Sequence, residues 1–568
     1  MNFKVSVNEA KDSNPTNYVI QSRFDIQNEQ YGSWEIKGKE GTMDFVPRGA
    51  AVYIEQIINH IDSGEKYYIL RFQDAQRREI TIEFPRKELT EQGIMALLSY
   101  GAQVTKQDAR ALIMSILNQE PEAECILQHK KLGFHMYNQR LVFLGKEAEG
   151  IESEYSGNLQ IGKTGKYSIW KKLIKENVLG HIPLEFALAV GGAGVVTDYL
   201  RRKISIENVL VHLVGDSSTG KTTAALLMVS CGSKPSMSGD SLVMNFSDTQ
   251  NAIMNTLQSA YAALIDEGSL CRYNPTSLLY SLSSGEEKKR LTRDLTKAES
   301  VHFNTAIIIT SEKSLLNMSD ENSGLLVRNI EIQGVKWTQD AQSADQIKSV
   351  LQNNYGWLVP KIARKIIQLE KAEDDKVLTS FAYWQNRFIE YAQEHGQYNP
   401  LTERAAKQYA IILVTAELIQ KVMKIELQLE EILIFLQKHS LVKDIEQTNI
   451  GQRALDFLLQ YMEHHFSQFV TTKDSEYPPN NCLGRIAKVR QIRLKNGMLS
   501  EQRLYISDIV LEKVLQEGAF PDKKVVLAKW KETGYLKSEK DRYISDISII
   551  GDVSVKGYVI NIPSANKE

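Results

Sequence analysis

Apolar residues follow different periodicities in different parts of the chain. In residues 1–165 they alternate over short segments such as 67–72 and 79–84, and helical patterns cover 90–100 and 106–117. Alternation with a period of two predicts strands, and a period of 3.6 predicts helices. We therefore expect an N-terminal α+β accessory domain over residues 1–165.

The pattern in residues 166–445 changes from mixed to purely helical. A helical segment at 183–201 comes first. The strands expected after it are 209–214, 242–245, 261–265, 304–309 and 329–332. Helical periodicity lies between them, and this alternation predicts an α/β domain with a parallel sheet and flanking helices. Only the helical period remains between about 340 and 440, which predicts a helical lid on the α/β core.

Residues 446–568 combine helices with hairpins. A helix is expected at 452–464, and alternating segments on both sides of Asn496-Gly497 predict a β-hairpin. Two helical segments, 510–517 and 523–533, precede a closing β segment that contains Gly551. Helix, helix and terminal hairpin is the order of a winged helix, so we expect a C-terminal winged-helix domain.

The composition limits the compartment and the kind of partner. The 568 residues carry a net charge of only −2, so any nucleic-acid site must be a local patch. The four cysteines are far apart and form no C-x-x-C pair, as expected for free thiols in a reducing cytosol. The N-terminus lacks the apolar segment of a signal peptide, and the run at 187–196 is too short to cross a bilayer. We expect a cytoplasmic protein that does not enter a membrane.

A complete phosphate-binding motif, G-x-x-x-x-G-K-[ST], follows the expected strand at 209–214. Its glycines allow backbone N–H groups to surround phosphates, and the next helix directs its positive end at them. Lys221 is expected to reach the β- and γ-phosphates, and Thr222 to hold Mg²⁺. The expected nucleotide-binding residues are Gly215, Asp216, Ser217, Ser218, Thr219, Gly220, Lys221, Thr222 and Thr223. The motif predicts a nucleoside triphosphate site, with ATP and Mg²⁺ as cofactors.

Two acids, Asp266 and Glu267, end the expected strand at 261–265. Asp266 would coordinate Mg²⁺ directly or through water, and Glu267 would polarise the water that attacks the γ-phosphate. A solvated strand end is the alternative for two such acids alone. Their place after a phosphate loop, with a strand and a helix between, favours an NTPase with a catalytic glutamate.

Polar residues at later strand ends are further candidates. Thr310 and Ser311 end a buried strand, where they would orient the lytic water as sensor 1 or simply cap the strand. Arg328 precedes another strand and can enter a neighbouring subunit's site as an arginine finger, with a surface ion pair as the alternative. Arg404 opens a lid helix, where a second phosphate sensor would lie.

Basic residues gather in two places. A charged insertion separates the acids from the sensor strand, and its DNA-binding candidates are Lys288, Lys289, Arg290, Arg293 and Lys297. On a projecting hairpin they would track a phosphate backbone, although the mixed charge of the insertion also fits a solvated loop. The second group lies in the C-terminal hairpin and along 523–533, where winged helices contact phosphates.

The chain resembles a family of phage, plasmid and mobile-element proteins with an AAA+ core. The matching residues are 214–223, Thr249-Gln250-Asn251 before the two acids, 280–290 and 324–328. More narrowly, it is similar to the self-loading, MCM-like replicative helicases of staphylococcal cassette and pathogenicity-island elements. Those proteins join an N-terminal domain, an AAA+ motor and a C-terminal winged helix.

The resemblance implies a homohexameric ring that hydrolyses ATP and unwinds single-stranded or forked DNA during element replication. By this resemblance, Lys221 and Thr222 would bind the nucleotide phosphates and magnesium. Asp266 and Glu267 would bind the metal and the attacking water, and Arg328 would be the arginine finger. Residues 293–297 would correspond to the pre-sensor hairpin. Many family members carry a Ser-Thr-Gly-Glu-like string where this chain has 310–312, and the asparagine usual in MCM proteins is absent there.

Two other functions agree with the same residues. One is an initiator that uses ATP to assemble on origin DNA without unwinding it. The other is a phosphate-loop ATPase that acts on protein. Strand displacement from a forked substrate separates the helicase from the initiator, and DNA binding separates both from the third function.

Overall fold

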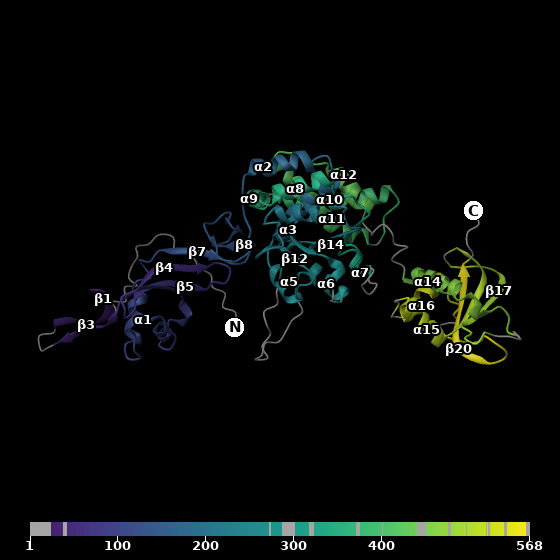
Figure 1. The fold of residues 1–568 in the computed structure, drawn as a ribbon, viewed down its shortest axis with the longest axis horizontal. Coiled ribbons are helices and arrows are strands. Elements are labelled where there is room, and N and C mark those ends of the chain that lie inside the picture. The colour runs from purple at the N-terminus through teal and green to yellow at the C-terminus, as the bar shows by residue number, and fades with distance from the viewer. Residues whose placement is uncertain are drawn as a thin grey trace. The chain divides into compact units, whose positions relative to one another are not determined.

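A computed structural model describes most of the chain. The described residues are 24–37, 42–271, 274–286, 302–316, 323–370, 375–399, 401–439, 450–474, 479–495, 497–518, 520, 523–538 and 542–563. The chain divides into two compact units (Figure 1). The first comprises residues 1–320 and 324–441, and the second comprises residues 442–568 with 321–323. The three-domain division at 165 and 445 stays a prediction.

The first unit begins with two β-sheets. An antiparallel sheet contains β1 (Phe24–Gln27), β2 (Gln30–Lys37) and β3 (Thr42–Ala50). A second sheet has the order β10-β7-β4-β5-β6, with bounds Glu154–Tyr155, Cys125–His129, Val52–His60, Lys66–Gln73 and Glu79–Pro85. The expected strands at 67–72 and 79–84 are confirmed as β5 and β6. The expected helix at 90–100 is a 3₁₀ helix, Gly93–Tyr100, and the next is α1 (Ala109–Leu117).

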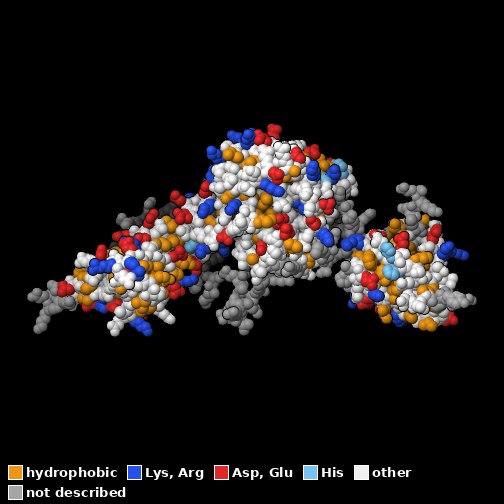
Figure 2. Space-filling model, viewed as in Figure 1, with side chains coloured by type: hydrophobic (Ala, Val, Ile, Leu, Met, Phe, Trp, Pro, Cys, Tyr) orange, Lys and Arg blue, Asp and Glu red, His pale blue; other side chains and the backbone are white. Residues whose placement is uncertain are grey.

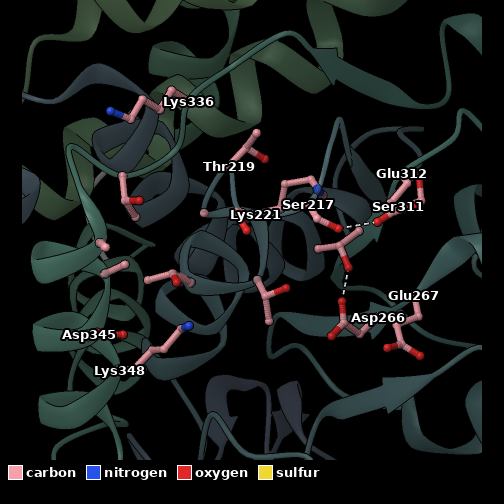
Figure 3. Close-up of a pocket in the computed structure, with 18 of the residues that line it drawn as sticks. Ser217, Thr219, Lys221, Asp266, Glu267, Ser311, Glu312, Lys336, Asp345 and Lys348 are labelled. Atoms are coloured by element: carbon pink, nitrogen blue, oxygen red, sulfur yellow. Dashed lines mark hydrogen bonds between the residues drawn. The ribbon is translucent and has the colours of Figure 1, made fainter.

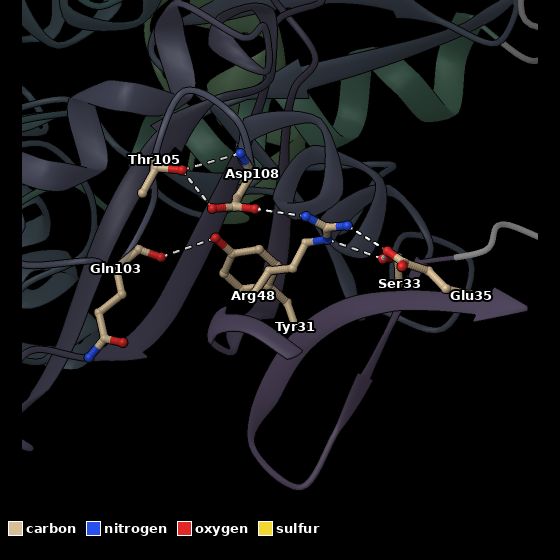
Figure 4. Close-up of polar contacts among 7 residues, drawn as sticks. All are labelled: Tyr31, Ser33, Glu35, Arg48, Gln103, Thr105 and Asp108. Atoms are coloured by element: carbon tan, nitrogen blue, oxygen red, sulfur yellow. Dashed lines mark hydrogen bonds and ion pairs between the residues drawn. The ribbon is translucent and has the colours of Figure 1, made fainter. Parts of the chain in front are cut away.

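A polar cluster ties the first sheet to the start of α1. Arg48 on β3 donates to Glu35 on β2 at 2.6 Å and to Asp108 at 3.2 Å, and its Nε donates to Ser33 at 3.1 Å (Figure 4). Hydrogen bonds and charge from Asp108 and Glu35 raise the pKa of Arg48. The tyrosine hydroxyl of Tyr31 donates to a backbone carbonyl beside the same cluster. These contacts fix β2 and β3 against the N-terminal end of α1.

A five-stranded parallel sheet forms the centre of the first unit. Its order is β12-β13-β14-β11-β15, with bounds Val243–Asn245, Ala263–Asp266, Ala306–Ser311, Val209–Val214 and Ile330–Gln333. All five expected strands are confirmed to within about two residues at each end. β14 lies between β11 and β13, so the phosphate-loop strand and the strand of the two acids are not neighbours. The carboxyl ends of all five strands meet at one edge of the sheet.

Helices cover both faces of this sheet. In Figure 1, α3 (Ile182–Arg201) and the helices labelled α8 to α12 lie on one side of the sheet. The helices α5 (Gln250–Thr256) and α6 (Pro275–Ser284) lie on the other. Residues 184–200 of α3 are all buried, because α3 packs between the sheet and the later helices. A helix that is apolar on all sides is typical of the core of a large domain.

The second half of the first unit is helical, as expected. The helices are α8 (Ala341–Leu351), α9 (Leu358–Glu370), α10 (Lys376–Glu394), α11 (Thr402–Met423) and α12 (Leu429–His439). α11 packs against α3, α9, α10 and α12. None of the described helices is both long and apolar enough to cross a bilayer.

In the described part of the second unit, α-helices pack with a sheet of order β16-β17-β18-β20-β19. The strand bounds are Phe469–Val470, Gly484–Arg493, Leu499–Ser507, Ser554–Pro563 and Ser545–Ser548. The helices are α14 (Ile450–His464), α15 (Asp508–Glu517) and α16 (Lys523–Thr533). The expected hairpins and helices are confirmed, and Gly497 has the positive φ that its turn requires. Trp530 of α16 is fully buried in the core of this unit.

Charges of both signs are mixed on the visible face of each unit, where Lys and Arg side chains are interspersed with Asp and Glu (Figure 2). The five DNA-binding candidates at 288–297 lie outside the described residues.

Candidate nucleotide site

The phosphate loop joins β11 to α4 (Lys221–Ser230) at the carboxyl edge of the sheet. Gly220 has φ +88°, and a Cβ there would lie 2.6 Å from Oγ1 of Thr338, so the position requires glycine. No side chain caps the N-terminus of α4. The first N–H groups of a helix carry partial positive charge and are unpaired within the helix, so this end of α4 fits an anion.

Lys221 is nearly buried and curls over the loop. Its Nζ donates to the carbonyl oxygens of Gly215 and Asp216, each at 2.7 Å. Burial lowers the pKa of Lys221, and nearby carboxylates, first that of Glu312, oppose this shift. The ammonium group therefore lies among the loop atoms that would surround a phosphate.

A cavity of about 900 Å³ opens in front of the loop (Figure 3). Its volume is in the range of cofactor sites. The expected site residues that line it are Ser217, Ser218, Thr219, Gly220, Lys221, Thr222, Thr223, Asp266, Glu267, Thr310 and Ser311. The fold thus brings together residues 217–223, both acids and both sensor candidates, whereas Gly215 and Asp216 do not line the cavity and contact Lys221 through their carbonyl oxygens.

Asp266 ends β13 and is almost fully buried. The hydroxyl of Thr310, at the end of the neighbouring β14, donates a hydrogen bond to its carboxylate. This contact places Thr310 beside the expected metal ligand. Thr310 and Ser311 alternate along β14, so their side chains leave the sheet on opposite faces.

Glu267 follows Asp266 in a left-handed conformation, with φ 59° and ψ 50°. A non-glycine residue rarely adopts this region, and such strain often occurs at functional sites. The carboxylate accepts a hydrogen bond of 3.0 Å from Nδ2 of Asn245, which ends β12. The turn and the amide together fix the direction of the Glu267 side chain.

The residues fit a nucleotide with Mg²⁺. Thr222 and Asp266 present oxygen atoms to the same cavity, and Mg²⁺ in such sites takes one or two protein oxygens together with substrate phosphates. Within the described ranges no three His, Cys, Asp or Glu side chains form a metal cluster. A magnesium site of this kind does not need all of its ligands from the protein, because the phosphates supply some of them.

The sequence reasoning missed several residues of the cavity. Lys336 and Lys348 line the side opposite Asp266 and Glu267, and Glu312 accepts a hydrogen bond from Ser217 of the loop (Figure 3). α8, which carries Lys348, folds back to the loop, and no local motif marks this approach. The same is true of Asn245 on the short strand β12.

The two arginines expected at the site lie elsewhere. Arg328 pairs with Glu207 at 2.8 Å and lies over the ring of Tyr280, and it does not line this cavity. Arg404 is exposed on the first turn of α11 and does not line this cavity either. Their roles as finger and second sensor stay predictions.

Comparisons with known proteins agree with the fold. The model of a family described as "Domain of unknown function (DUF927)" matches residues 24–301, and that of the "Cch helix turn helix domain" matches residues 449–565. A solved structure titled "SCCmec type IV Cch - active helicase" is similar over 95% of this chain and 97% of that chain, with a TM-score of 0.71 and 21% sequence identity. This similarity extends over both units and shows a common fold. No curated protein sequence matches the chain.

Proposed function

We propose that this protein is an ATP-dependent DNA helicase, a ring-forming, MCM-like AAA+ motor that replicates a mobile genetic element in the cytoplasm. One observation carries the proposal. The phosphate loop, Asp266, Thr310 and Glu267 line one cavity, and Asn245 orients Glu267 from outside it. They do so in a chain whose fold is that of a structure titled as a helicase.

The residues of the cavity divide the work of hydrolysis. ATP would supply the phosphoanhydride bond that is cleaved, and Mg²⁺ would neutralise the charge of the phosphates. Lys221 and the N–H groups of α4 bind the phosphates, and Thr222 and Asp266 hold the metal. Glu267 accepts the proton of the attacking water, and Thr310 fixes Asp266. ATP turnover therefore requires that the Glu267 carboxylate keep the orientation set by its hydrogen bond from Asn245.

The ring and the DNA contacts complete the proposal. Arg328 enters the site of a neighbouring subunit, and the subunits form a homohexamer. Arg404 acts as a second phosphate sensor, and residues 288–297 track single-stranded or forked DNA. The C-terminal unit binds DNA through its helix-turn-helix, which the match to residues 449–565 supports.

ATP turnover with and without DNA tests the motor. We expect forked DNA to stimulate hydrolysis by the wild-type chain, and Glu267→Gln to remove at least about 99% of turnover. Full turnover by Glu267→Gln would refute the site. An initiator that assembles on DNA without unwinding is the second candidate, because the C-terminal DNA-binding unit fits it equally well.

A further inference from the structure

Two ionisable side chains are buried within apolar strands beneath the nucleotide cavity. His212 is the single polar residue of β11, and Glu331 lies opposite it on the neighbouring strand β15. Their side chains are 0% exposed, and Nδ1 of His212 lies 3.0 Å from Oε2 of Glu331. Buried ionisable groups are costly unless they are paired and hydrogen-bonded, and the contact between these two side chains provides that pairing.

The other ring nitrogen of His212 reaches the wall of the cavity. Nε2 lies 2.5 Å from Oγ of Ser311, the last residue of β14. Oγ of Ser311 lies 2.6 Å from the carbonyl oxygen of Lys313. Both ring nitrogens of His212 are therefore engaged, Nδ1 with the carboxylate of Glu331 and Nε2 with the hydroxyl of Ser311.

Glu331 is held ionised in the same network. Burial raises the pKa of Glu331, but the hydrogen bonds that it accepts, first that of His212, outweigh burial and keep this pKa below its ordinary value. Ser314 donates to the same oxygen as His212 at 2.9 Å, and Gln333 donates to the other oxygen at 2.5 Å. Both carboxylate oxygens of Glu331 are thus hydrogen-bonded.

Ser311 touches both halves of the nucleotide site. Its carbonyl oxygen accepts a hydrogen bond of 3.2 Å from the backbone N–H of Gly215, which opens the phosphate loop. Its Cβ lies 3.0 Å from the position that a Cβ on Gly268 would take, so it packs on the turn after Glu267. A change in the position of Ser311 therefore moves the loop relative to the catalytic carboxylate.

We propose that His212 is a positioning residue for ATP turnover, which holds Ser311 between the phosphate loop and the turn that carries Glu267 and is itself held by Glu331. The inference rests on the proposed function. His212 touches no reacting atom, so its loss should misplace groups rather than weaken nucleotide binding. A misplacement of about 1 Å can cost about a hundredfold in rate.

Steady-state kinetics of His212→Gln, Ser311→Ala and the double variant test the proposal in the full chain. Each single variant should lower kcat by about ten- to a hundredfold with KM for ATP within about threefold. The double variant should be no slower than the slower single one, because both changes break one linkage. Independent losses that multiply, or an unchanged kcat for His212→Gln, would overturn the proposal.

His129→Gln is the matched control. His129 is equally buried and makes hydrogen bonds of 2.8 Å to Ser153 and to the carbonyl oxygen of Gly145, away from the cavity. Loss of a structural histidine should lower the melting temperature and leave kcat unchanged. If His212→Gln lowers kcat no more than His129→Gln does at equal thermal stability, the positioning role is wrong.

The kinetic outcomes separate this inference from the proposed function. A wild-type chain without ATP turnover would refute the proposed function as well. Normal turnover that is insensitive to His212→Gln would refute only this inference.

Discussion

Nδ2 of Asn245 lies 3.0 Å from Oε2 of Glu267 and donates a hydrogen bond to it. Asn245 ends β12 and Glu267 follows β13, and the two strands are neighbours in the parallel sheet. The carboxylate that we assign to water activation is therefore oriented by a residue some twenty positions earlier in the sequence.

We predict that Asn245→Asp lowers ATP turnover by about tenfold or more, because it removes the donor and sets a like charge beside Glu267. Nucleotide affinity should change little, since Asn245 does not line the cavity. Asn245→Ala is the control that removes the donor without adding charge, and its loss should be smaller. Equal turnover in Asn245→Asp and wild type would show that the contact does not orient Glu267.

Lys221→Ala and Glu267→Gln should both abolish turnover, for different reasons. Lys221 lies within the loop and supplies charge to the phosphates, whereas Glu267→Gln removes only the proton acceptor. Binding of a fluorescent ATP analogue should therefore persist in Glu267→Gln and weaken in Lys221→Ala. Substantial hydrolysis by either variant would contradict the assigned roles.

Arg328→Ala should lose turnover through its effect on a neighbouring subunit. Arg328 is paired with Glu207 outside the cavity of its own chain. Mixing Arg328→Ala with Lys221→Ala should restore activity, because some interfaces then combine an intact loop with an intact arginine. Glu207→Gln, which removes the ion pair and keeps Arg328, should retain turnover. A mixture no more active than its components would refute the shared site.

Asp508→Asn should destabilise the C-terminal unit by about 1 kcal/mol at neutral pH, a modest value because the pair is partly exposed. Asp508 accepts hydrogen bonds from Lys523 at 2.8 Å and Tyr558 at 2.7 Å. These bonds lower the pKa of Asp508 from its ordinary 3.8. A lowered carboxyl pKa stabilises the fold above the ordinary value, and this stabilisation disappears as the pH falls through the lowered pKa.

Hydrogen exchange of peptides from residues 450–563 measures this effect. The difference between wild type and Asp508→Asn should shrink as the pH falls below about 3.8. Glu532→Gln is the control, since its pair with Lys529 is more exposed and should contribute less. A difference between wild type and Asp508→Asn that does not depend on pH would contradict the assigned pKa.

The sequence predicts much of the first unit's sheet and of its nucleotide cavity. The motif at 215–222 fixes β11 and α4, and apolar runs that end in polar residues mark β13 and β14. Asp266 and Thr310 were each predicted as site residues at strand ends, and their hydrogen bond across β13 and β14 is a finding of the structure. The local sequence pattern is therefore sufficient to predict site residues that stand at the ends of strands.

Residues that depend on strand order could not be found in this way. His212 and Glu331 are single ionisable residues in apolar strands, a signal visible in the sequence, but their contact requires that β15 pair with β11. Lys336 and Lys348 reach the cavity because the chain after β15 returns to the loop, which periodicity does not encode. Arg404 is exposed on the first turn of α11 and does not line the cavity, so its role as a phosphate sensor stays a prediction.

Displacement of a labelled strand from a forked duplex tests the central claim most directly. The wild-type chain should release the strand only with hydrolysable ATP and Mg²⁺, and Glu267→Gln should bind the fork without releasing it. ATP turnover and particle mass, measured in the same samples, relate release to hydrolysis and to ring assembly. DNA-stimulated turnover without strand release would contradict the helicase assignment and favour the initiator.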